Sequence, residues 1–255
     1  MEVFGTEHIV FMIVSVIVLT ALLIVLKKFV PQNKVGLVMK ITAFCGLVLI
    51  VINRIVVSKS RNADFIDFLP DTYCSMMGLI LPLTVLLFKP TTKIYQYAVF
   101  AGFIGGLITF FYPDFLVYFD DFFNIHPFTG ILYHTLMVFI FAESLVLKYF
   151  TPSFRKWTAF PIGLAFMVVY ACFGNSVLGQ TNNMYLNAPL LPDTILSWWF
   201  TGIMLILLYT LILQIYEIIT LPVGEWTAVK GIKCIKSRFC SKKAKSDDEK
   251  ISSNE

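Results

Sequence analysis

A cysteine and a histidine that can cooperate in acyl transfer lie at comparable depths inside apolar segments. Cys74 follows Pro70 by four residues, about 6 Å at the helical rise, and His134 follows Pro127 by seven residues, about 10 Å. A thiolate attacks an ester to give an acyl-enzyme, and a neighbouring imidazole takes the thiol proton and later returns it to an alcohol. The two side chains can therefore share one layer if their helices are neighbours.

Each of the two residues also has a simpler interpretation. No other cysteine lies near the same face as Cys74, so the thiol is either an inert packed group or a nucleophile. His134 is an ionisable residue within an apolar segment, and such residues usually face the bundle interior or a cavity. Of the other histidines, we expect His8 to be solvated and His126 to cap a loop.

Other polar residues in this layer can support the same chemistry. Arg54 lies four residues from the outer end of its segment. Its guanidinium either favours a thiolate or holds a phosphate, or its side chain extends to the membrane–water interface, as is common for arginines at helix ends. A developing oxyanion needs hydrogen-bond donors. The candidates are Tyr73, Tyr133 and Asn175, and the sequence does not choose among them.

The sequence predicts no cofactor, no metal site and no nucleic-acid partner. Cys234 and Cys240 lack the CxxC spacing of a zinc site. Cys45 and Cys172 lie in apolar runs, and we expect them to be small core residues. Membrane phospholipids are the predicted partners, and the oligomeric state is left open.

Composition determines which elements must position these residues. Of the 255 residues, 58% are hydrophobic and 14% are charged, whereas about a quarter of the residues in a soluble domain are charged. The 25 Phe, 11 Tyr and 4 Trp are typical of helices that meet lipid and its interface. A mean hydropathy of +0.79 excludes a disordered, collagen-like or disulfide-framework protein.

The positions of the charged residues predict two parts of the chain. Residues 1–220 form an all-α bundle of seven transmembrane helices. Residues 221–255 form a basic, partly disordered cytoplasmic tail. A crossing helix needs about 20 mostly apolar residues. A polar loop is expected over Gly174–Asp193, which contains no Lys, Arg or Glu. The seven predicted segments are Ile9–Leu26, Ile41–Val57, Thr72–Phe88, Ile94–Pro113, the stretch between Asp121 and Glu143, Trp157–Phe173 and Thr194–Tyr216.

The distribution of Lys and Arg predicts an outside N-terminus and a cytoplasmic C-terminus. With this orientation 17 of the 20 basic residues lie on the cytoplasmic side, where short basic loops are retained. The first segment lacks a basic leader and a cleavage pattern, so we interpret it as a retained anchor in the cell membrane. Lysines alternate with apolar residues over 230–239, which is typical of a helix on an anionic inner leaflet or of a solvated tail that fixes topology.

Five short motifs occur in an order that resembles a known family. They are Pro70-Asp71-Thr72-Tyr73-Cys74, Gly105-Gly106, Tyr112-Pro113-Asp114, Tyr133-His134 and Asn183-Met184-Tyr185-Leu186. Over roughly residues 5–220 the chain resembles the YwaF family of integral membrane proteins, whose animal relatives are TMEM-type lipid acyltransferases. The resemblance implies acyl transfer to lysophospholipids through a Cys and a His, which fall on Cys74 and His134. Bacterial relatives commonly carry His-Leu-Cys where this chain has Thr72-Tyr73-Cys74.

The predicted function is therefore a membrane acyltransferase, with two alternatives left open. Because acyl-CoA is cytoplasmic, an outward-facing thiol would take its acyl chain from a phospholipid, which makes the protein a CoA-independent transacylase with Arg54 on a phosphate. A retinal protein is excluded because Thr194–Tyr216 contains no Lys. A small-solute transporter with a polar path and a non-enzymatic membrane protein are the alternatives. The path residues would be Asn175, Gln180, Asn182 and Asn183.

Overall fold

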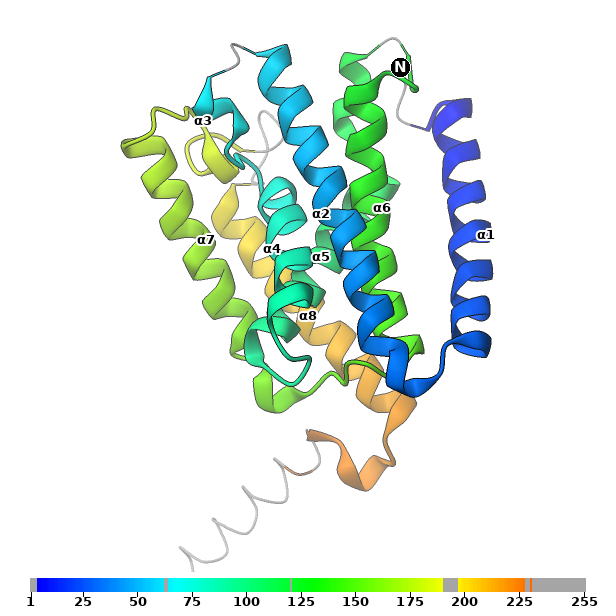
Figure 1. The fold of residues 1–255 in the computed structure, drawn as a ribbon. Coiled ribbons are helices and arrows are strands. Elements are labelled where there is room, and N and C mark those ends of the chain that lie inside the picture. Colours follow the sequence, from blue (N-terminus) through cyan, green and yellow to red (C-terminus); the bar gives the residue numbers. More distant parts are fainter. Residues whose placement is uncertain (1–3, 62–63, 120, 190–196, 228–229, 231–255) are drawn as a thin grey trace, which may run out of the picture. The chain divides into compact units, whose positions relative to one another are not determined.

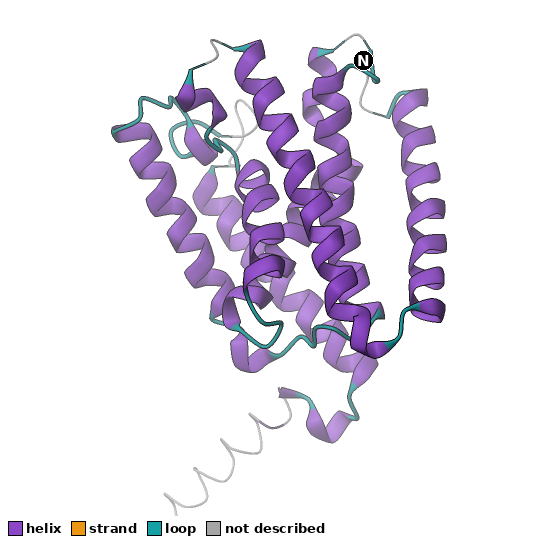
Figure 2. Ribbon diagram, in the orientation of Figure 1, coloured by secondary structure: helices purple, strands orange, loops and turns teal. Residues whose placement is uncertain are grey.

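The computed structural model describes residues 4–61, 64–119, 121–189, 197–227 and 230, and these are helical or in loops, with no strand among them (Figures 1 and 2). Six helices in this part are long and apolar enough to cross a membrane. They are α1 (Thr6–Phe29), α2 (Val35–Ser60), α5 (Lys93–Phe111), α6 (Ile125–Val146), α7 (Ala159–Ser176, with its preceding turn) and α8 (Trp198–Thr220).

Each of the seven predicted segments coincides with a helix, but the seventh apolar helix, α4 (Tyr73–Leu87), has only 15 residues. This is shorter than the roughly 20 residues that a straight crossing needs. The count of seven membrane spans and the orientation of the termini therefore stay predictions. Thr194, the predicted start of the last segment, lies outside the described residues.

Helix ends differ from the predicted ones where a charge does not stop a helix. α2 begins at Val35 rather than Ile41. Lys40 lies within the first two turns of this helix, and its exposed side chain lets a charged residue be part of the helix. α4 begins where a capping box forms: the Ser75 N–H donates to Thr72 Oγ1 at 3.2 Å, and the Thr72 N–H donates to Ser75 Oγ at 3.1 Å. The expected polar loop begins only after Ser176, where α7 ends.

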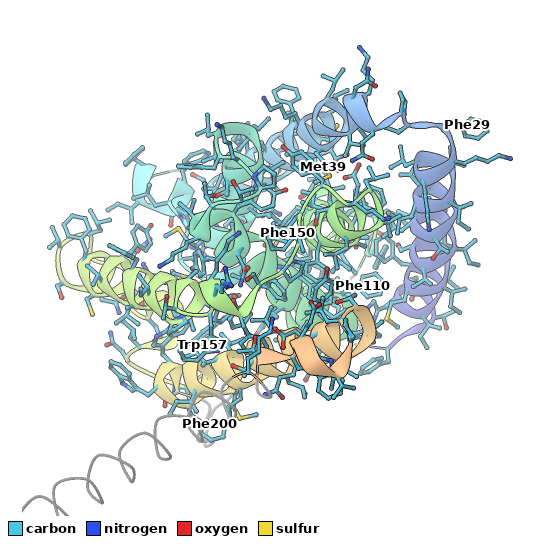
Figure 3. All side chains as sticks on the ribbon, turned by 90° about the horizontal axis from the view of Figure 1, so that it is seen from below. Phe29, Met39, Phe110, Phe150, Trp157 and Phe200 are labelled. Atoms are coloured by element: carbon cyan, nitrogen blue, oxygen red, sulfur yellow. The ribbon has the colours of Figure 1, made fainter. Side chains whose placement is uncertain are left out.

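Residues 1–209 form one compact unit, and α2, α4, α5 and α6 pack against one another at its centre. α1 lies at the margin beside α6 (Figure 1). In the end-on view of Figure 3, Met39 and Phe150 lie among the central helices, whereas Phe29 projects from the edge. Met39 and Phe150 are buried and Phe29 is exposed, as expected for a bundle with an apolar rim that faces lipid.

Several expectations for single residues are corrected. Cys45 and Cys172 are exposed, because an apolar run in a membrane helix includes the lipid-facing side as well as the core. His8 is buried instead of solvated, and its Nε2 lies 3.1 Å from the Phe110 carbonyl oxygen. The cap of α6 is Asn124, whose Oδ1 accepts the His126 N–H at 3.1 Å, so His126 is the capped residue.

Candidate functional site

Cys74 is the second residue of α4, and Thr72 is the N-cap of this helix. Its thiol is partly exposed and lies 3.8 Å from the Gly105 carbonyl oxygen and 3.5 Å from Thr109 Oγ1, both on α5. The amide groups in the first turn of a helix favour negative charge. Because the Gly105 carbonyl oxygen only accepts, the thiol that contacts it carries its proton, and a base must remove that proton before nucleophilic attack.

Glycines let the neighbouring helices approach the Cys74 layer closely. A Cβ on Gly105 would lie 2.8 Å from Tyr73 Cε1 and 3.5 Å from Cys74 Sγ. A Cβ on Gly106 would lie 2.7 Å from the His134 carbonyl oxygen. Consecutive residues of α5 therefore contact the helix of each candidate catalytic residue.

His134 is buried on α6, and its hydrogen bonding defines its tautomer. Its Nδ1 lies 2.7 Å from the Gly130 carbonyl oxygen. A carbonyl oxygen only accepts, so Nδ1 carries a proton, and in the neutral imidazole the lone pair is on Nε2. Within the described residues Nε2 has no hydrogen-bond partner, and neither ring nitrogen is bonded to the Cys74 thiol. Nε2 is therefore the ring atom that can accept a proton.

Tyr133 packs between the helices of the two candidate catalytic residues. Its ring lies 3.2 Å from the position of a Cβ on Gly78, so it bridges α6 to α4. Its ring centroid lies 4.0 Å from that of the adjacent His134. The condition that the helices of Cys74 and His134 be neighbours is met, since α4 and α6 are in contact.

Arg54 is buried and holds the segment that leads into α4. Its Nη2 donates to the Asp67 and Leu69 carbonyl oxygens, both at 2.6 Å, and its Nε donates to the Phe68 carbonyl oxygen at 3.1 Å. Its Nη1 pairs with Asp71 Oδ1 at 3.3 Å. Every guanidinium nitrogen is engaged, so these contacts favour a positioning role for Arg54 over phosphate binding.

Tyr73 and Asn175 also use their polar atoms in the protein. The Tyr73 hydroxyl donates to the Ala101 carbonyl oxygen at 2.9 Å. Asn175 Oδ1 accepts the Asn183 N–H at 2.7 Å. Of the three oxyanion donors considered from the sequence, Tyr133 is the one whose ring lies against His134, with the two ring centroids 4.0 Å apart.

A loop over residues 179–186 covers the start of α4. The Met184 N–H donates to the Asp71 carbonyl oxygen at 2.9 Å, and the Tyr170 hydroxyl donates to that of Pro70 at 2.8 Å. Met184 and Tyr185 have φ angles of 52° and 57°, a left-handed conformation that non-glycine residues rarely adopt. Two of the motifs noted in the sequence therefore meet at this point.

The amides considered for a transport path bond mainly to one another in this loop. Asn183 Nδ2 donates to Gln180 Oε1 at 2.5 Å, and Asn182 Oδ1 accepts the N–H groups of Asn187 and Ala188 at 3.0 Å. They gather at one end of the bundle rather than along a line across it. This arrangement orders the loop.

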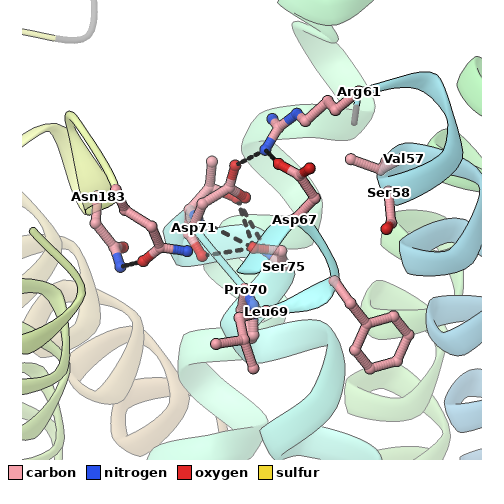
Figure 4. Close-up of polar contacts among 12 residues, drawn as sticks. Val57, Ser58, Arg61, Asp67, Leu69, Pro70, Asp71, Ser75 and Asn183 are labelled. Atoms are coloured by element: carbon pink, nitrogen blue, oxygen red, sulfur yellow. Dashed lines mark hydrogen bonds and ion pairs between the residues drawn. The ribbon is translucent and has the colours of Figure 1, made fainter. Parts of the chain in front are cut away.

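A pocket of about 420 Å³ opens between this loop and the segment before α4. We call it the polar pocket. In Figure 4, Arg61 points toward the carboxylates of Asp67 and Asp71 at its wall, with Asn183 on the opposite side. Its polar lining includes Arg61, Asp67, Asp71, Thr72, Gln180 and Asn183. Within the described chain no group of three or more His, Cys, Asp or Glu is arranged to hold a metal ion.

Sequence reasoning named the amide side chains of this pocket, Gln180, Asn182 and Asn183, as path residues, but it missed the charged ones. Arg61 and Asp67 were not considered as site residues, and Asp71 entered only as part of a motif. The available signal was the series of aspartates at 64, 67 and 71, which follows Arg54 and Arg61 closely enough in the sequence to pair with them.

Comparison with known proteins gives one family match. A family model described as the TMEM164 family matches residues 3–219, which cover most of the chain. No curated protein and no solved structure matches the chain.

Proposed function

This chain belongs to the TMEM164 family of multi-pass membrane proteins, and we propose that it transfers acyl chains between membrane phospholipids and lysophospholipids. Cys74 is the nucleophile and His134 the proton acceptor in this proposal. The observation that carries it is the partly exposed Cys74 thiol in the capped first turn of α4, beside a polar pocket.

The reaction has two steps that share one acyl-enzyme. In the first, the Cys74 thiolate attacks an ester carbonyl of a phospholipid, the ester C–O bond breaks, and the departing alkoxide takes a proton to leave as a lysophospholipid. In the second, the hydroxyl of another lysophospholipid attacks the thioester, and the thiolate is released. His134 accepts the thiol proton before the first attack, gives it to the leaving oxygen, and accepts the hydroxyl proton in the second step.

Tyr133 is the residue that we assign to the oxyanion. The Tyr73 hydroxyl already donates to the Ala101 carbonyl oxygen and Asn175 is held through its amide oxygen, whereas the Tyr133 ring packs against α4 and lies against the imidazole. A phenol that donates to the developing oxyanion stabilises the transition state more than the ground state.

The acyl donor follows from the predicted orientation. With the N-terminus outside, the Cys74 end of the bundle lies on the extracytoplasmic side of the cell membrane. Cytoplasmic acyl-CoA then cannot reach the thiol. A phospholipid of the same membrane then supplies the acyl chain. A reporter inserted between Asp114 and Asp121 should be extracytoplasmic, and one fused after Glu225 should be cytoplasmic. Finding both reporters on one side would contradict this choice of donor.

Purified full-length protein given phospholipid and labelled lysophospholipid tests the activity. We expect labelled phospholipid without added acyl-CoA, no product from Cys74→Ala, and a rate about 10²- to 10⁴-fold lower from His134→Gln. Cys172→Ala is the matched control, because that cysteine is exposed on α7 and should be dispensable. Product from Cys74→Ala, or a strict need for acyl-CoA, would overturn the proposal.

A further inference from the structure

Thr109 on α5 is a buried threonine whose hydrogen bonding differs from that of other threonines in the bundle. Within an apolar helix a threonine hydroxyl usually donates to the carbonyl oxygen four residues earlier. Three buried or partly buried threonines do so, at 3.2, 2.7 and 2.8 Å: Thr42, Thr129 and Thr135. Thr109 is 7% exposed, and its recorded hydrogen-bond partner within the described residues is not the Gly105 carbonyl oxygen but Cys74 Sγ, at 3.5 Å.

The acceptor that Thr109 would ordinarily use is occupied by the thiol. Gly105 lies four residues before Thr109, and its carbonyl oxygen accepts the S–H hydrogen of Cys74 at 3.8 Å. If the Thr109 hydroxyl only accepted from the thiol, its own hydrogen would be buried without a partner, which is uncommon in folded proteins. The hydrogen bond at 3.5 Å therefore has Thr109 as its donor and Cys74 Sγ as its acceptor.

Gly105 allows the sulfur to reach both groups on α5. A Cβ at this position would lie 3.5 Å from Cys74 Sγ and 2.8 Å from Tyr73 Cε1. A side chain here would push the first turn of α4 away from α5, and the thiol would move away from the carbonyl oxygen and from the Thr109 hydroxyl. The close approach of the two helices thus places a hydroxyl donor on the candidate nucleophile.

A hydroxyl donor at the sulfur distinguishes the thiolate from the thiol. A neutral thiol sulfur is a weak acceptor, whereas a hydrogen bond to an ionised group is roughly twice as strong as one between neutral groups. The Thr109 hydroxyl therefore stabilises the Cys74 thiolate more than the thiol. An interaction that strengthens as charge develops on the reacting atom accelerates the step in which that charge is used.

We infer that Thr109 is a further catalytic residue, whose hydroxyl donates to the Cys74 thiolate and activates it as a nucleophile. This inference rests on the proposed acyl transfer, because it adds a residue to that reaction. In the first step the S–H proton passes to His134, the bond from sulfur to the acyl carbon forms, and the ester C–O bond breaks. In the second step the bond from sulfur to the acyl carbon breaks, and the same hydroxyl stabilises the departing thiolate. Thr109 keeps its own proton throughout.

The acylated state gives the hydroxyl a second acceptor. Once the thiol proton has left, the Gly105 carbonyl oxygen has lost its donor from Cys74, and this is the oxygen to which a threonine at position 109 ordinarily donates. The Thr109 hydroxyl turns to this oxygen while the sulfur carries the acyl chain and returns to the sulfur when the thiolate is released. Both states therefore leave the hydroxyl hydrogen with a partner.

Alkylation of the thiol tests the hydrogen bond without any catalysis. Full-length protein in detergent is treated with N-ethylmaleimide near neutral pH, and the rate at Cys74 is followed by peptide mass spectrometry, with the exposed Cys172 of the same sample as reference. Maleimide reacts with the thiolate. Thr109→Val should lower the rate at Cys74 at least about tenfold, as expected for the loss of one hydrogen bond to a charged group. Thr109→Ser keeps the hydroxyl and should recover most of the rate.

Thr135→Val is the matched control, because Thr135 is a buried threonine of α6 whose hydroxyl donates to the Ile131 carbonyl oxygen. It should leave the rate at Cys74 unchanged. The deficit of Thr109→Val should disappear at alkaline pH, where the thiol is ionised in every variant. An unchanged rate in folded Thr109→Val, or a deficit that persists at alkaline pH, would overturn the inference. If Thr109→Val does not fold, Thr109→Ala removes the same hydroxyl and is judged by the same outcomes.

Acyl transfer measured on the same variants separates failure of this inference from failure of the proposed function. Thr109→Val should lower kcat at least about tenfold with an unchanged KM for lysophospholipid, and Thr109→Ser should restore it. Slow alkylation of Thr109→Val in a protein that transfers no acyl chain would overturn the function and support the hydrogen bond. Normal alkylation and a normal kcat in Thr109→Val would overturn the inference and leave the function.

Discussion

Arg54 and Glu143 are both buried charged side chains in apolar helices at opposite ends of the bundle, yet their partners differ. Arg54 donates to three loop carbonyls and pairs with Asp71. Glu143 accepts one hydrogen bond, from Thr42 Oγ1 at 3.1 Å, and its Oε2 has no partner within the described residues. A buried charge with all its bonds made fixes the geometry around it, whereas a carboxyl group with one bond does not. The Cys74 end is therefore the preorganised end.

Removing Arg54 should have the largest effect on stability. Arg54→Ala leaves the Asp67, Phe68 and Leu69 carbonyls without a donor and half of Asp71 unpaired, so we expect a loss of about 3–5 kcal/mol in the free energy of unfolding. Unfolding in detergent, followed by circular dichroism, measures it. Arg155→Ala, at an exposed arginine, should change the free energy by less than about 0.5 kcal/mol. Equal losses in the two variants would remove the distinction between the ends.

Gly106→Ala should have the next largest effect. The added Cβ would lie 2.7 Å from the His134 carbonyl oxygen, and a helix backbone cannot move aside as a side chain can. We expect a loss of about 1–3 kcal/mol, measured by the same unfolding experiment. Gly202→Ala is the matched control, because nothing lies within 4 Å of its added Cβ. Equal stability of the two variants would show that α5 and α6 do not touch at His134.

Glu143→Gln should change the free energy of unfolding by less than about 1.5 kcal/mol. The amide oxygen keeps the acceptor for Thr42, and the other carboxyl oxygen has no recorded partner to lose. Thermal unfolding in detergent measures the change. A loss comparable with that of Arg54→Ala would mean that Glu143 is part of a satisfied network, and the contrast between the two ends would fail.

Arg61→Ala should have the smallest effect on stability. Its side chain is half exposed, and exposed ion pairs contribute about 0–1 kcal/mol because solvent screens them. A shift in the free energy of unfolding within this range separates Arg61, a half-exposed arginine of the polar pocket, from the structural Arg54. A loss of several kcal/mol would place Arg61 with Arg54 as a structural residue.

The helices could be predicted from the sequence, since charge-free runs of sufficient length reveal apolar helices directly. The depths of Cys74 and His134 in the membrane stay a prediction from the helical rise, whereas the contact between their helices is confirmed. The role of Arg54 could not be predicted, since its partners are backbone carbonyls of residues 67–69, and a carbonyl has no sequence signature. The same limit applies to Asn183, which the sequence offers as a path residue and which the loop with its left-handed turn at Met184 and Tyr185 instead bonds to Gln180 and Asn175.

Mass spectrometry of the intact protein after incubation with a phospholipid of defined acyl chains tests the central claim most directly. The account predicts a mass increase equal to one acyl chain, located on Cys74 by peptide mapping. The adduct should be removed by hydroxylamine, as a thioester is, and discharged by lysophospholipid. Cys74→Ala should carry none, while Cys172→Ala should be acylated normally. Acyl transfer that proceeds at full rate without an adduct on Cys74 would contradict the account.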